Sequence, residues 1–152
     1  MDVDVKSFMT GAPISIEADI SALAALDLML EHAIRHLPVV DSHRKVCGIV
    51  SFEDLRAALP ISLSLSVPPS VEDRQRALDV SVAEVMTPAP VTIDDEAALE
   101  DAVSRMLEGR FSCLPVVDEQ GRLDGILTAT DLLQALATVL WSTDGRKHDA
   151  GR

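Results

Sequence analysis

The sequence predicts an α+β fold made of two copies of a strand, helix, strand, strand, helix unit. At an offset of 77 residues and without a gap, 21 of the 55 positions from Val5 to Leu59 carry the same residue as in 82–136. In each copy, short β-branched runs alternate with a stretch of helical periodicity. A 55-residue unit buries too little surface alone, so the two copies are expected to pack together as one body.

Each copy begins with a short apolar run, 14–16 or 91–93, that predicts a strand. An amphipathic helix is expected next. Its apolar positions are Leu23, Leu26, Leu30 and Ile34 in the first copy and Leu99, Val103, Met106 and Leu107 in the second. The runs 37–40 and 46–51 flank a polar turn and predict a hairpin. A final helix is expected to begin near Phe52 and, in the second copy, near Ala129.

These elements divide the chain into a first repeat at 5–59, a linker at 60–81, a second repeat at 82–141 and a flexible tail at 142–152. Residues 60–69 alternate apolar residues with Ser. This pattern predicts an extended strap under the helices of its own domain, with a dimer contact as the alternative. Residues 72–79 are charged and predict a short helix.

Composition excludes several classes of partner. Thirteen Lys and Arg against 25 Asp and Glu give a net charge of −12, which opposes binding to nucleic-acid phosphates. Three Phe, one Trp and no Tyr provide no platform for stacked bases. The chain has an acidic N-terminus and no apolar run near the roughly 18 residues of a membrane span. We therefore expect a cytoplasmic protein with no membrane partner, in which Cys47 and Cys113 are reduced core residues.

The Met9-Thr10 opening, the Leu-Pro-Val-Val-Asp strand at 37–41 and the Gly-Ile-x-Ser-x-x-Asp junction at 48–54 resemble a cystathionine-β-synthase (CBS) domain. The second copy repeats all three, with Thr128 in the place of Ser51, so the resemblance covers 5–59 and 82 to about 140. Within this family, the residues at 34–38 and 113–115 are most similar to those of acetoin-utilisation-type proteins.

The resemblance implies a regulatory pair of CBS domains, or Bateman module. Its two repeats would be related by a pseudo-twofold axis, each a small sheet with two helices on one face. The pair would form a homodimer and bind an adenosine nucleotide or related ligand in clefts between the repeats. The candidate ligands are AMP, ADP, ATP and S-adenosylmethionine, with no cofactor required, and an unidentified partner protein would receive the signal.

Each strand-to-helix junction carries a hydroxyl residue followed three positions later by an acid: Ser51 with Asp54, and Thr128 with Asp131. This spacing is typical of a capping box. It also suits a nucleotide, because an ionised Asp accepts both ribose hydroxyl hydrogens while the neighbouring hydroxyl and free helix amides hold a phosphate. The resemblance places nucleotide contacts here, so we expect both carboxylates to turn outward. The glycine three residues before each hydroxyl is expected to admit the ligand to the backbone.

Adenine would need an aliphatic slot, because no aromatic ring is available to stack on it. The resemblance assigns the slot to Ile14, Ile16, Leu37 and Pro38 in the first copy and to Val91, Ile93, Leu114 and Pro115 in the second. All eight are equally suitable as core residues.

The copies differ before the Leu-Pro-Val strand, where Arg35-His36 is replaced by Ser112-Cys113. The resemblance makes Arg35 and His36 the candidates for a phosphate contact, and solvent exposure at a helix end is the alternative. His32 and His36 have the spacing of a zinc pair on a helix, but no third ligand accompanies them, so we assign no metal site.

Two other functions compete with a ligand sensor. An enzyme would need a nucleophile, a base and an orienting acid. Ser51, His36 and Asp54 are residues of these three types. The second copy, however, has Cys113 in place of the histidine. We therefore predict no catalytic residues. The other alternative is a dimeric scaffold that binds no ligand and serves only as an interaction protein.

Overall fold

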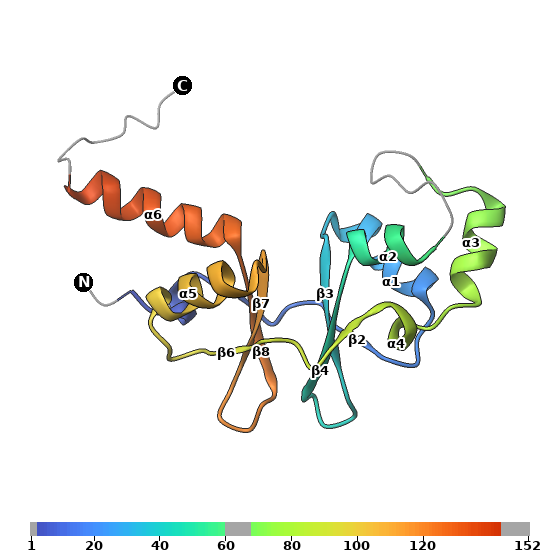
Figure 1. Ribbon diagram of the computed structural model, residues 1–152, viewed down its shortest axis with the longest axis horizontal. Helices are drawn as coiled ribbons and strands as arrows, with labels where there is room; N and C mark the ends of the chain where they lie inside the picture. Colours follow the sequence, from blue (N-terminus) through green and yellow to red (C-terminus); the bar gives the residue numbers. More distant parts are fainter. Residues whose placement is uncertain (1–2, 60–67, 144–152) are drawn as a thin grey trace.

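The computed structural model describes residues 3–59 and 68–143 and contains two small sheets set side by side, with helices on their outer faces (Figure 1). Both repeats show the predicted order of strand, helix, strand, strand, helix, and the α+β fold is confirmed. The first repeat contains β2 (Ile16–Glu17), α1 (Ala22–His32), β3 (His36–Val40), β4 (Val46–Ser51) and α2 (Phe52–Ala58). The second contains β6 (Ile93–Asp94), α5 (Leu99–Gly109), β7 (Cys113–Val117), β8 (Leu123–Thr128) and α6 (Ala129–Thr143).

The two sheets share one register. Strand β2 runs parallel to β3, with Ile16 opposite Val39, and β6 runs parallel to β7, with Ile93 opposite Val116. Strands β3–β4 and β7–β8 form antiparallel hairpins, each with an irregularity directly after Val39 or Val116. Since even the irregularity recurs at the 77-residue offset, the sequence repeat is also a repeat in three dimensions.

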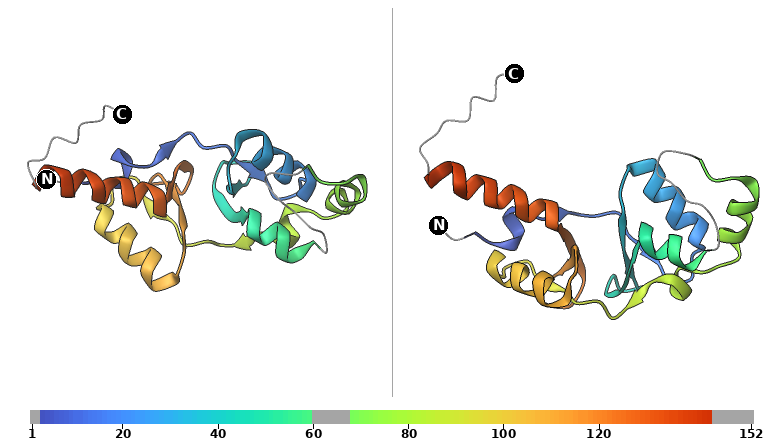
Figure 2. Two further views of the ribbon diagram at one scale, coloured as in Figure 1. Left: turned by 90° about the horizontal axis from the view of Figure 1, so that it is seen from above. Right: turned by 45° about the horizontal axis from the view of Figure 1, so that its top comes forward.

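The opening residues of each repeat belong to the sheet of the other repeat, which the sequence analysis did not predict. A 3-10 turn, η1 (Val5–Ser7), and β1 (Thr10–Gly11) begin the chain, yet β1 pairs with β8 and Val5 is buried in the second core. Reciprocally, α4 (Val82–Val85) packs in the first repeat, where β5 (Thr87–Pro88) pairs with β4. Two segments therefore cross between the halves, blue and yellow in Figure 2.

Two glycines make room for the crossing segments. A Cβ on Gly48 would collide with the sulfur of Met86, and a Cβ on Gly125 would collide with the sulfur of Met9. The expectation that these glycines let a ligand approach the backbone is therefore wrong. The methionine of each Met-Thr opening occupies that space, which explains why Met and Gly occur together in both copies.

Each repeat has its own hydrophobic core between its sheet and helices. In the first, α1 begins because Ser21 Oγ accepts a hydrogen bond from Ala24 N at 3.1 Å, and the helix then buries Leu26 and Met29 against β3 and α2. Burying one such leucine contributes about 1.5 to 3 kcal/mol. Each core shields the helical face of its sheet from solvent. Between the repeats, β3 contacts β8 and β4 contacts β7.

The two hairpin tips bond to each other at one end of the molecule. Val46 N donates to the Gly121 carbonyl at 3.3 Å, and Leu123 N donates to the Arg44 carbonyl at 2.9 Å. Together with the crossing segments, these bonds join the repeats into one unit.

The predicted linker helix is present as α3 (Val71–Leu78) and lies against α1 in the first repeat. Its Ala77 is buried in the first core, and Arg74 pairs with Asp27 of α1 at 3.0 Å. The strap predicted at 60–69 falls mostly on 60–67, outside the described residues, as does the tail from 144 onward. Helix α6 extends to Thr143, two residues into the predicted tail.

Over residues 3–59 and 68–143, no helix combines the length and apolarity needed to cross a membrane. Both cysteines are free thiols. Cys113 is buried, and this burial raises the pKa of its thiol to about 12, so it stays protonated at neutral pH. Cys47 is only partly buried against the first core.

Candidate functional site

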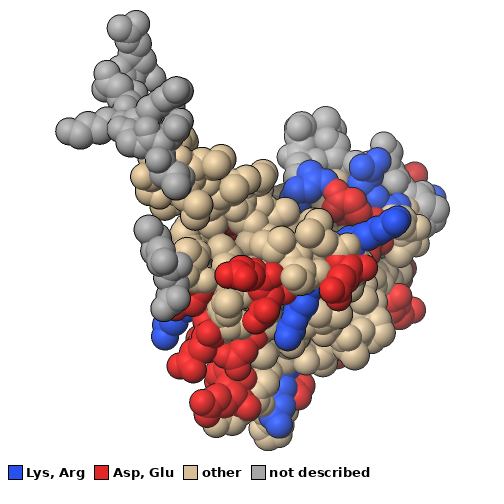
Figure 3. Space-filling view, turned by 60° about the vertical axis from the view of Figure 1, so that its left-hand side comes forward, with Lys and Arg blue, Asp and Glu red and all other residues tan. Residues whose placement is uncertain are grey.

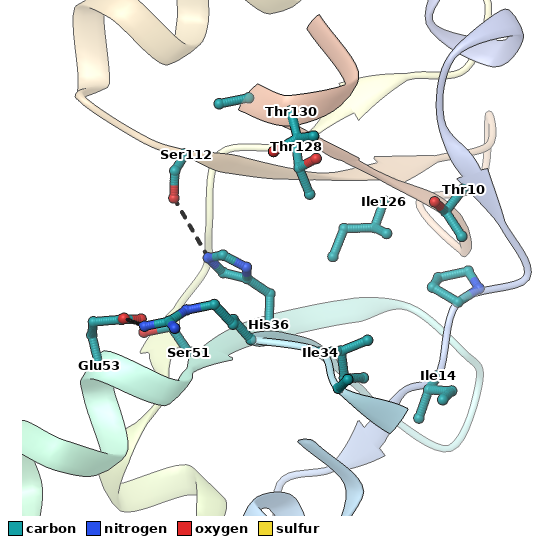
Figure 4. A pocket seen from close by; sticks show the side chains of 14 residues that line it. Thr10, Ile14, Ile34, His36, Ser51, Glu53, Ser112, Ile126, Thr128 and Thr130 are labelled. Atoms are coloured by element: carbon teal, nitrogen blue, oxygen red, sulfur yellow. Dashed lines mark hydrogen bonds and ion pairs between the residues drawn. The ribbon is translucent and has the colours of Figure 1, made fainter. Parts of the chain in front are cut away.

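A cleft of about 800 Å³ lies between the two repeats. Figure 4 shows its walls, with first-repeat residues facing β8 and the start of α6. It is lined by Thr10, Pro13, Ile14, Ala33, Ile34, Arg35, His36, Ser51 and Glu53 from residues 10–53, and by Ser112, Ile126, Thr128, Ala129 and Thr130 from the second repeat. Its volume is in the range of small-molecule sites.

The end of α1 brings one wall to the cleft. Helix α1 stops at His32 because Ala33 takes a left-handed conformation with φ of 52°. The chain then turns so that Ile34 and Arg35 reach the cleft and His36 begins β3. Ile34 was predicted as a helix position and is instead a lining residue. The same turn separates His32 from His36, so the two imidazoles do not share a helix face.

The junction of β4 and α2 forms a complete capping box. Asp54 N donates to Ser51 Oγ at 3.0 Å, and Ser51 N donates to Asp54 Oδ2 at 2.8 Å. The box satisfies two polar groups that helix formation leaves unpaired. It fixes Ser51 at the rim of the cleft with its hydroxyl beside the helix start.

The junction of β8 and α6 has the same arrangement. Thr128 N donates to Asp131 Oδ2 at 2.8 Å, Thr128 Oγ1 donates to the same oxygen at 3.0 Å, and Asp131 N lies 3.3 Å from Thr128 Oγ1. Both junction hydroxyls therefore border one cleft, approached from opposite repeats.

The two carboxylates fold back onto their own backbones, unlike the outward orientation that we expected. The capping bonds use Oδ2 of Asp54 and Oδ2 of Asp131. Neither aspartate is among the residues that line the cleft, although each directly follows a lining residue, Glu53 or Thr130. Their Oδ1 atoms form no hydrogen bond with the other described residues. A carboxylate has two oxygens with about four lone-pair directions, so capping through one oxygen leaves the other available to a ligand hydroxyl.

Arg35 is held at the mouth of the cleft by two contacts. Its guanidinium forms an ion pair with Glu53 of α2 and lies over the Phe52 ring, 5.4 Å from the ring centre. Both partners of the ion pair are about half exposed. The predicted cation is therefore at the cleft, but its charge is compensated by a neighbouring acid.

His36 contacts the opposite repeat. Its Nε2 lies 3.5 Å from Ser112 Oγ (Figure 4). Burial lowers the pKa of His36 below 6.5 and the nearby Arg35 charge lowers it further, while Asp54 opposes both. The imidazole is therefore neutral at pH 7 and can either donate or accept a hydrogen bond.

The predicted aliphatic slot is only partly in the cleft. Of its residues, Ile14 lines the cleft, whereas Ile16 and Leu37 belong to the first core and Ile93 and Leu114 to the second. Pro38 and Pro115 are buried on β3 and β7, and Val91 is 42% exposed. The apolar lining instead comes from Pro13, Ile14, Ile34 and Ile126.

The sequence analysis also missed several polar lining residues. Glu53 and Thr130 each lie two positions after a junction hydroxyl, in the first turn of a helix. The sequence could have indicated both residues, because the first turn of a helix lies close to the residue that caps it. Thr10 was not identifiable, because it reaches the cleft only through the exchange of β1 into the second sheet.

This arrangement suits a flat apolar ring with a polar attachment. Branched aliphatic side chains form one part of the lining, and the hydroxyls of Thr10, Ser51, Ser112, Thr128 and Thr130 form another. The described residues contain no cluster of three or more His, Cys, Asp or Glu side chains with the geometry to hold a metal ion.

The fold and cleft define a tandem pair of small α+β repeats with a cleft between them. A model of the CBS domain matches residues 5–61 and 82–138, so the chain belongs to the CBS domain family. A CBS domain-containing protein of Dictyostelium discoideum is 36% identical over 141 residues, covering 92% of this chain and 95% of that relative. The chain spans 57% of the length of CBSX1, a chloroplastic Arabidopsis thaliana relative that is 34% identical.

Solved structures show the same architecture. CBSX2 in complex with AMP is 32% identical, with a TM-score of 0.76 over 90% of this chain and 98% of that one. A putative acetoin utilization protein (AcuB) from Vibrio cholerae is 28% identical, with a TM-score of 0.74 over 97% and 99%. The CBS domain pair of protein MJ0100, in complex with 5-methylthioadenosine and S-adenosyl-L-methionine, is 26% identical, with a TM-score of 0.74 over 91% and 98%.

Proposed function

We propose that this CBS pair is a non-catalytic regulatory module that binds an adenosine nucleotide or related ligand between its repeats and signals to a partner protein. The observation that carries the proposal is that both junction hydroxyls, Ser51 and Thr128, border the same cleft as Arg35 and His36. Similar CBS pairs in complex with AMP and with S-adenosyl-L-methionine support an adenosine-type ligand. AMP, ADP, ATP and S-adenosylmethionine all remain candidates.

We assign each part of such a ligand to a part of the lining. Ile14, Ile34 and Ile126 contact the adenine faces, as the aliphatic lining predicts. We place the ribose hydroxyls on Oδ1 of Asp54 or Asp131, each of which directly follows a lining residue, while Oδ2 keeps its capping bond. Charge-assisted hydrogen bonds of this kind contribute about 1.5 to 3 kcal/mol.

A ligand in this cleft would regulate by shifting a population. Because the lining comes from both repeats, bound ligand stabilises the relative placement of the repeats that best fits it, by no more than its differential affinity. The crossing segments and the bonded hairpin tips link that placement to both sheets. A partner protein that contacts both repeats would sense the change.

The module is proposed to be non-catalytic because Ser51, His36 and Asp54 do not assemble into a nucleophile, a base and an orienting acid. The Asp54 carboxylate accepts from Ser51 N and does not orient the imidazole. Ser51 Oγ accepts a bond from Asp54 N, whereas His36 lies against Ser112 of the other repeat. The cytoplasmic location stays a prediction, and the Arabidopsis relative CBSX1 is a chloroplastic protein.

The helical face of the second repeat supports a homodimer. Leu136 of α6 is 52% exposed, whereas its equivalent Leu59 is 3% exposed in a core that α3 closes. Leu107 of α5 and Leu133 of α6 are also exposed, at 75% and 65%. Figure 3 shows few charged side chains over α6, while acidic side chains gather below it. Among the described residues this apolar face is exposed, and we propose that a second copy of the chain covers it.

Sedimentation velocity tests the dimer. We expect Leu107→Glu with Leu133→Glu to convert a dimer into a monomer, because each buried apolar contact is replaced by a charge. The matched control is Val71→Glu on α3, where the side chain is already 84% exposed, and it should remain dimeric. A monomeric wild type, or dimers in all variants, contradicts this surface assignment.

Calorimetric titration with adenosine, AMP, ATP and S-adenosylmethionine tests the ligand, with GMP as the matched control for base recognition. We expect saturable binding of at least one adenosine compound and weaker binding of GMP. At a hundred times its dissociation constant, the ligand should add about 2.7 kcal/mol to the free energy of unfolding. If no adenosine compound binds or stabilises, the sensor proposal fails.

The second candidate is a dimeric scaffold without a ligand. The observation in its favour is that both junction carboxylates already satisfy a structural role as caps. Dimerisation together with failure of every adenosine compound in the titration would establish this alternative.

A further inference from the structure

The charges of the cleft are arranged asymmetrically between the repeats. Arg35 and Glu53 form an ion pair on the first-repeat side. At the 77-residue offset their equivalents are Ser112 and Thr130, and all four residues line the same cleft. One wall therefore carries a compensated charge pair where the opposite wall carries two neutral hydroxyls.

Arg35 is the one Lys or Arg among the described lining residues, so it is the one cationic side chain of that type that the described lining offers to a phosphate. Its guanidinium is occupied by the Glu53 carboxylate and rests over Phe52. A phosphate that binds Arg35 must share it with Glu53, whose negative charge repels the phosphate at short range.

The other described lining residues add no Lys or Arg. The carboxylates of Asp54 and Asp131 belong to the two capping boxes at the cleft, and the whole chain carries a net charge of −12. His36 is neutral at pH 7, because burial lowers its pKa. Each additional phosphate on a ligand is therefore opposed by the local and the overall field.

We propose that Glu53 is a charge-selectivity residue, which makes the cleft favour adenosine compounds with no phosphate or one phosphate over diphosphates and triphosphates. This inference rests on the proposed binding of an adenosine compound and assigns the class of ligand that the cleft prefers. Thr130 cannot play the same role on the opposite wall, because it carries no charge. Glu53 acts on the ligand directly, through repulsion, and also by competing for Arg35.

Calorimetry with adenosine, AMP, ADP and ATP in magnesium-free buffer tests the inference on four proteins. Glu53→Gln keeps the shape of the side chain and removes its charge. Glu53→Thr installs the residue of the second repeat. The matched control is Glu119→Gln in the exposed hairpin turn of the second repeat, which changes the net charge equally but lies outside the cleft lining.

We expect wild type to bind AMP about tenfold more tightly than ATP, because a charge at contact distance typically changes affinity by such a factor. Either Glu53 substitution should raise ATP affinity about tenfold and leave adenosine affinity within about twofold. The difference between wild type and Glu53→Gln should shrink as salt is raised, since exposed charges are screened. Circular dichroism checks that both variants are folded.

Three results would overturn the inference. One is equal binding of AMP and ATP by wild type. Another is an unchanged ATP to AMP affinity ratio in both Glu53 variants, and the third is the same gain in Glu119→Gln. Adenosine binding with unchanged selectivity overturns only the role of Glu53, whereas failure of all four compounds overturns the proposed function as well.

Discussion

Asp54 is predicted to act both as a helix cap and as a ribose ligand, and two substitutions separate these roles. Asn keeps a carbonyl oxygen that can replace Oδ2 in its bond from Ser51 N, which spans 2.8 Å in the native box. Its amide group donates, however, and cannot accept from a ribose hydroxyl as Oδ1 does. Ala removes both the capping oxygen and the ribose acceptor.

The magnitudes follow from these contacts. Asp54→Ala removes the carboxylate half of the capping box while Ser51 Oγ remains, so we expect a loss of about 0.5 to 1 kcal/mol in the free energy of unfolding. Asp54→Asn should lose less, only the interaction of the charge with the helix dipole, typically about 0.3 kcal/mol when partly exposed. For AMP, both variants lose a charge-assisted bond worth about 1.5 to 3 kcal/mol, a 10- to 150-fold loss of affinity.

Urea unfolding measures the first quantity and calorimetry with AMP the second. Asp73→Asn in the first turn of α3 serves as the control, because it removes one charge next to a comparable cap. The reasoning is refuted if Asp54→Asn binds AMP like wild type, whether or not Asp54→Ala loses affinity. A loss of unfolding free energy in Asp54→Asn as large as in Asp54→Ala would refute the division of roles between the two oxygens.

Three further predictions concern other parts of the molecule. Asp131→Asn should weaken adenosine binding at the second junction with little loss in the free energy of unfolding. Calorimetry on the double variant with Asp54→Asn should show a larger loss of affinity than either single variant. An affinity loss identical to that of one single variant would mean that one junction is unused. His36 has a pKa lowered below 6.5 by burial, so the unfolded state binds its proton first; its contribution to stability is present above pH 6.5 and lost as the pH falls through the lowered pKa. His36→Gln should flatten that part of the urea-unfolding profile between pH 5.5 and 7.5, and an unchanged slope would contradict it. Gly48→Ala should lower the free energy of unfolding by about 1 to 3 kcal/mol, because the new Cβ collides with Met86. Adding Met86→Ala in the same chain should recover part of that loss. Absence of any recovery would contradict the packing account.

The sequence predicted those parts of the fold that depend on local pattern. The repeat, the hairpins and the starts of α2 and α6 follow from β-branched runs and capping residues, whose physics acts within a few residues. The exchange of β1 and β5 between sheets was not predictable in this way. Each of these strands contains two residues, and the adjacent Met9 and Met86 pack on Gly125 and Gly48, which are distant in sequence.

The candidate site was predicted to a similar degree. Ser51, Thr128, Arg35 and His36 reach the cleft as expected, because their positions at strand ends determine where they lie. The aliphatic slot was not separable from the core, since Leu37 and Leu114 have the same composition signal in either role. The competition of Glu53 for Arg35 needed three-dimensional placement, because 18 residues separate the two in sequence.

A crystal structure of the protein soaked with AMP tests the central claim most directly. The account predicts the nucleoside between the two repeats, with its ribose hydroxyls on Oδ1 of Asp54 or Asp131 and Oδ2 still bonded to the helix cap. A cleft that holds only water at saturating AMP, or a nucleoside seated outside it, would contradict the account.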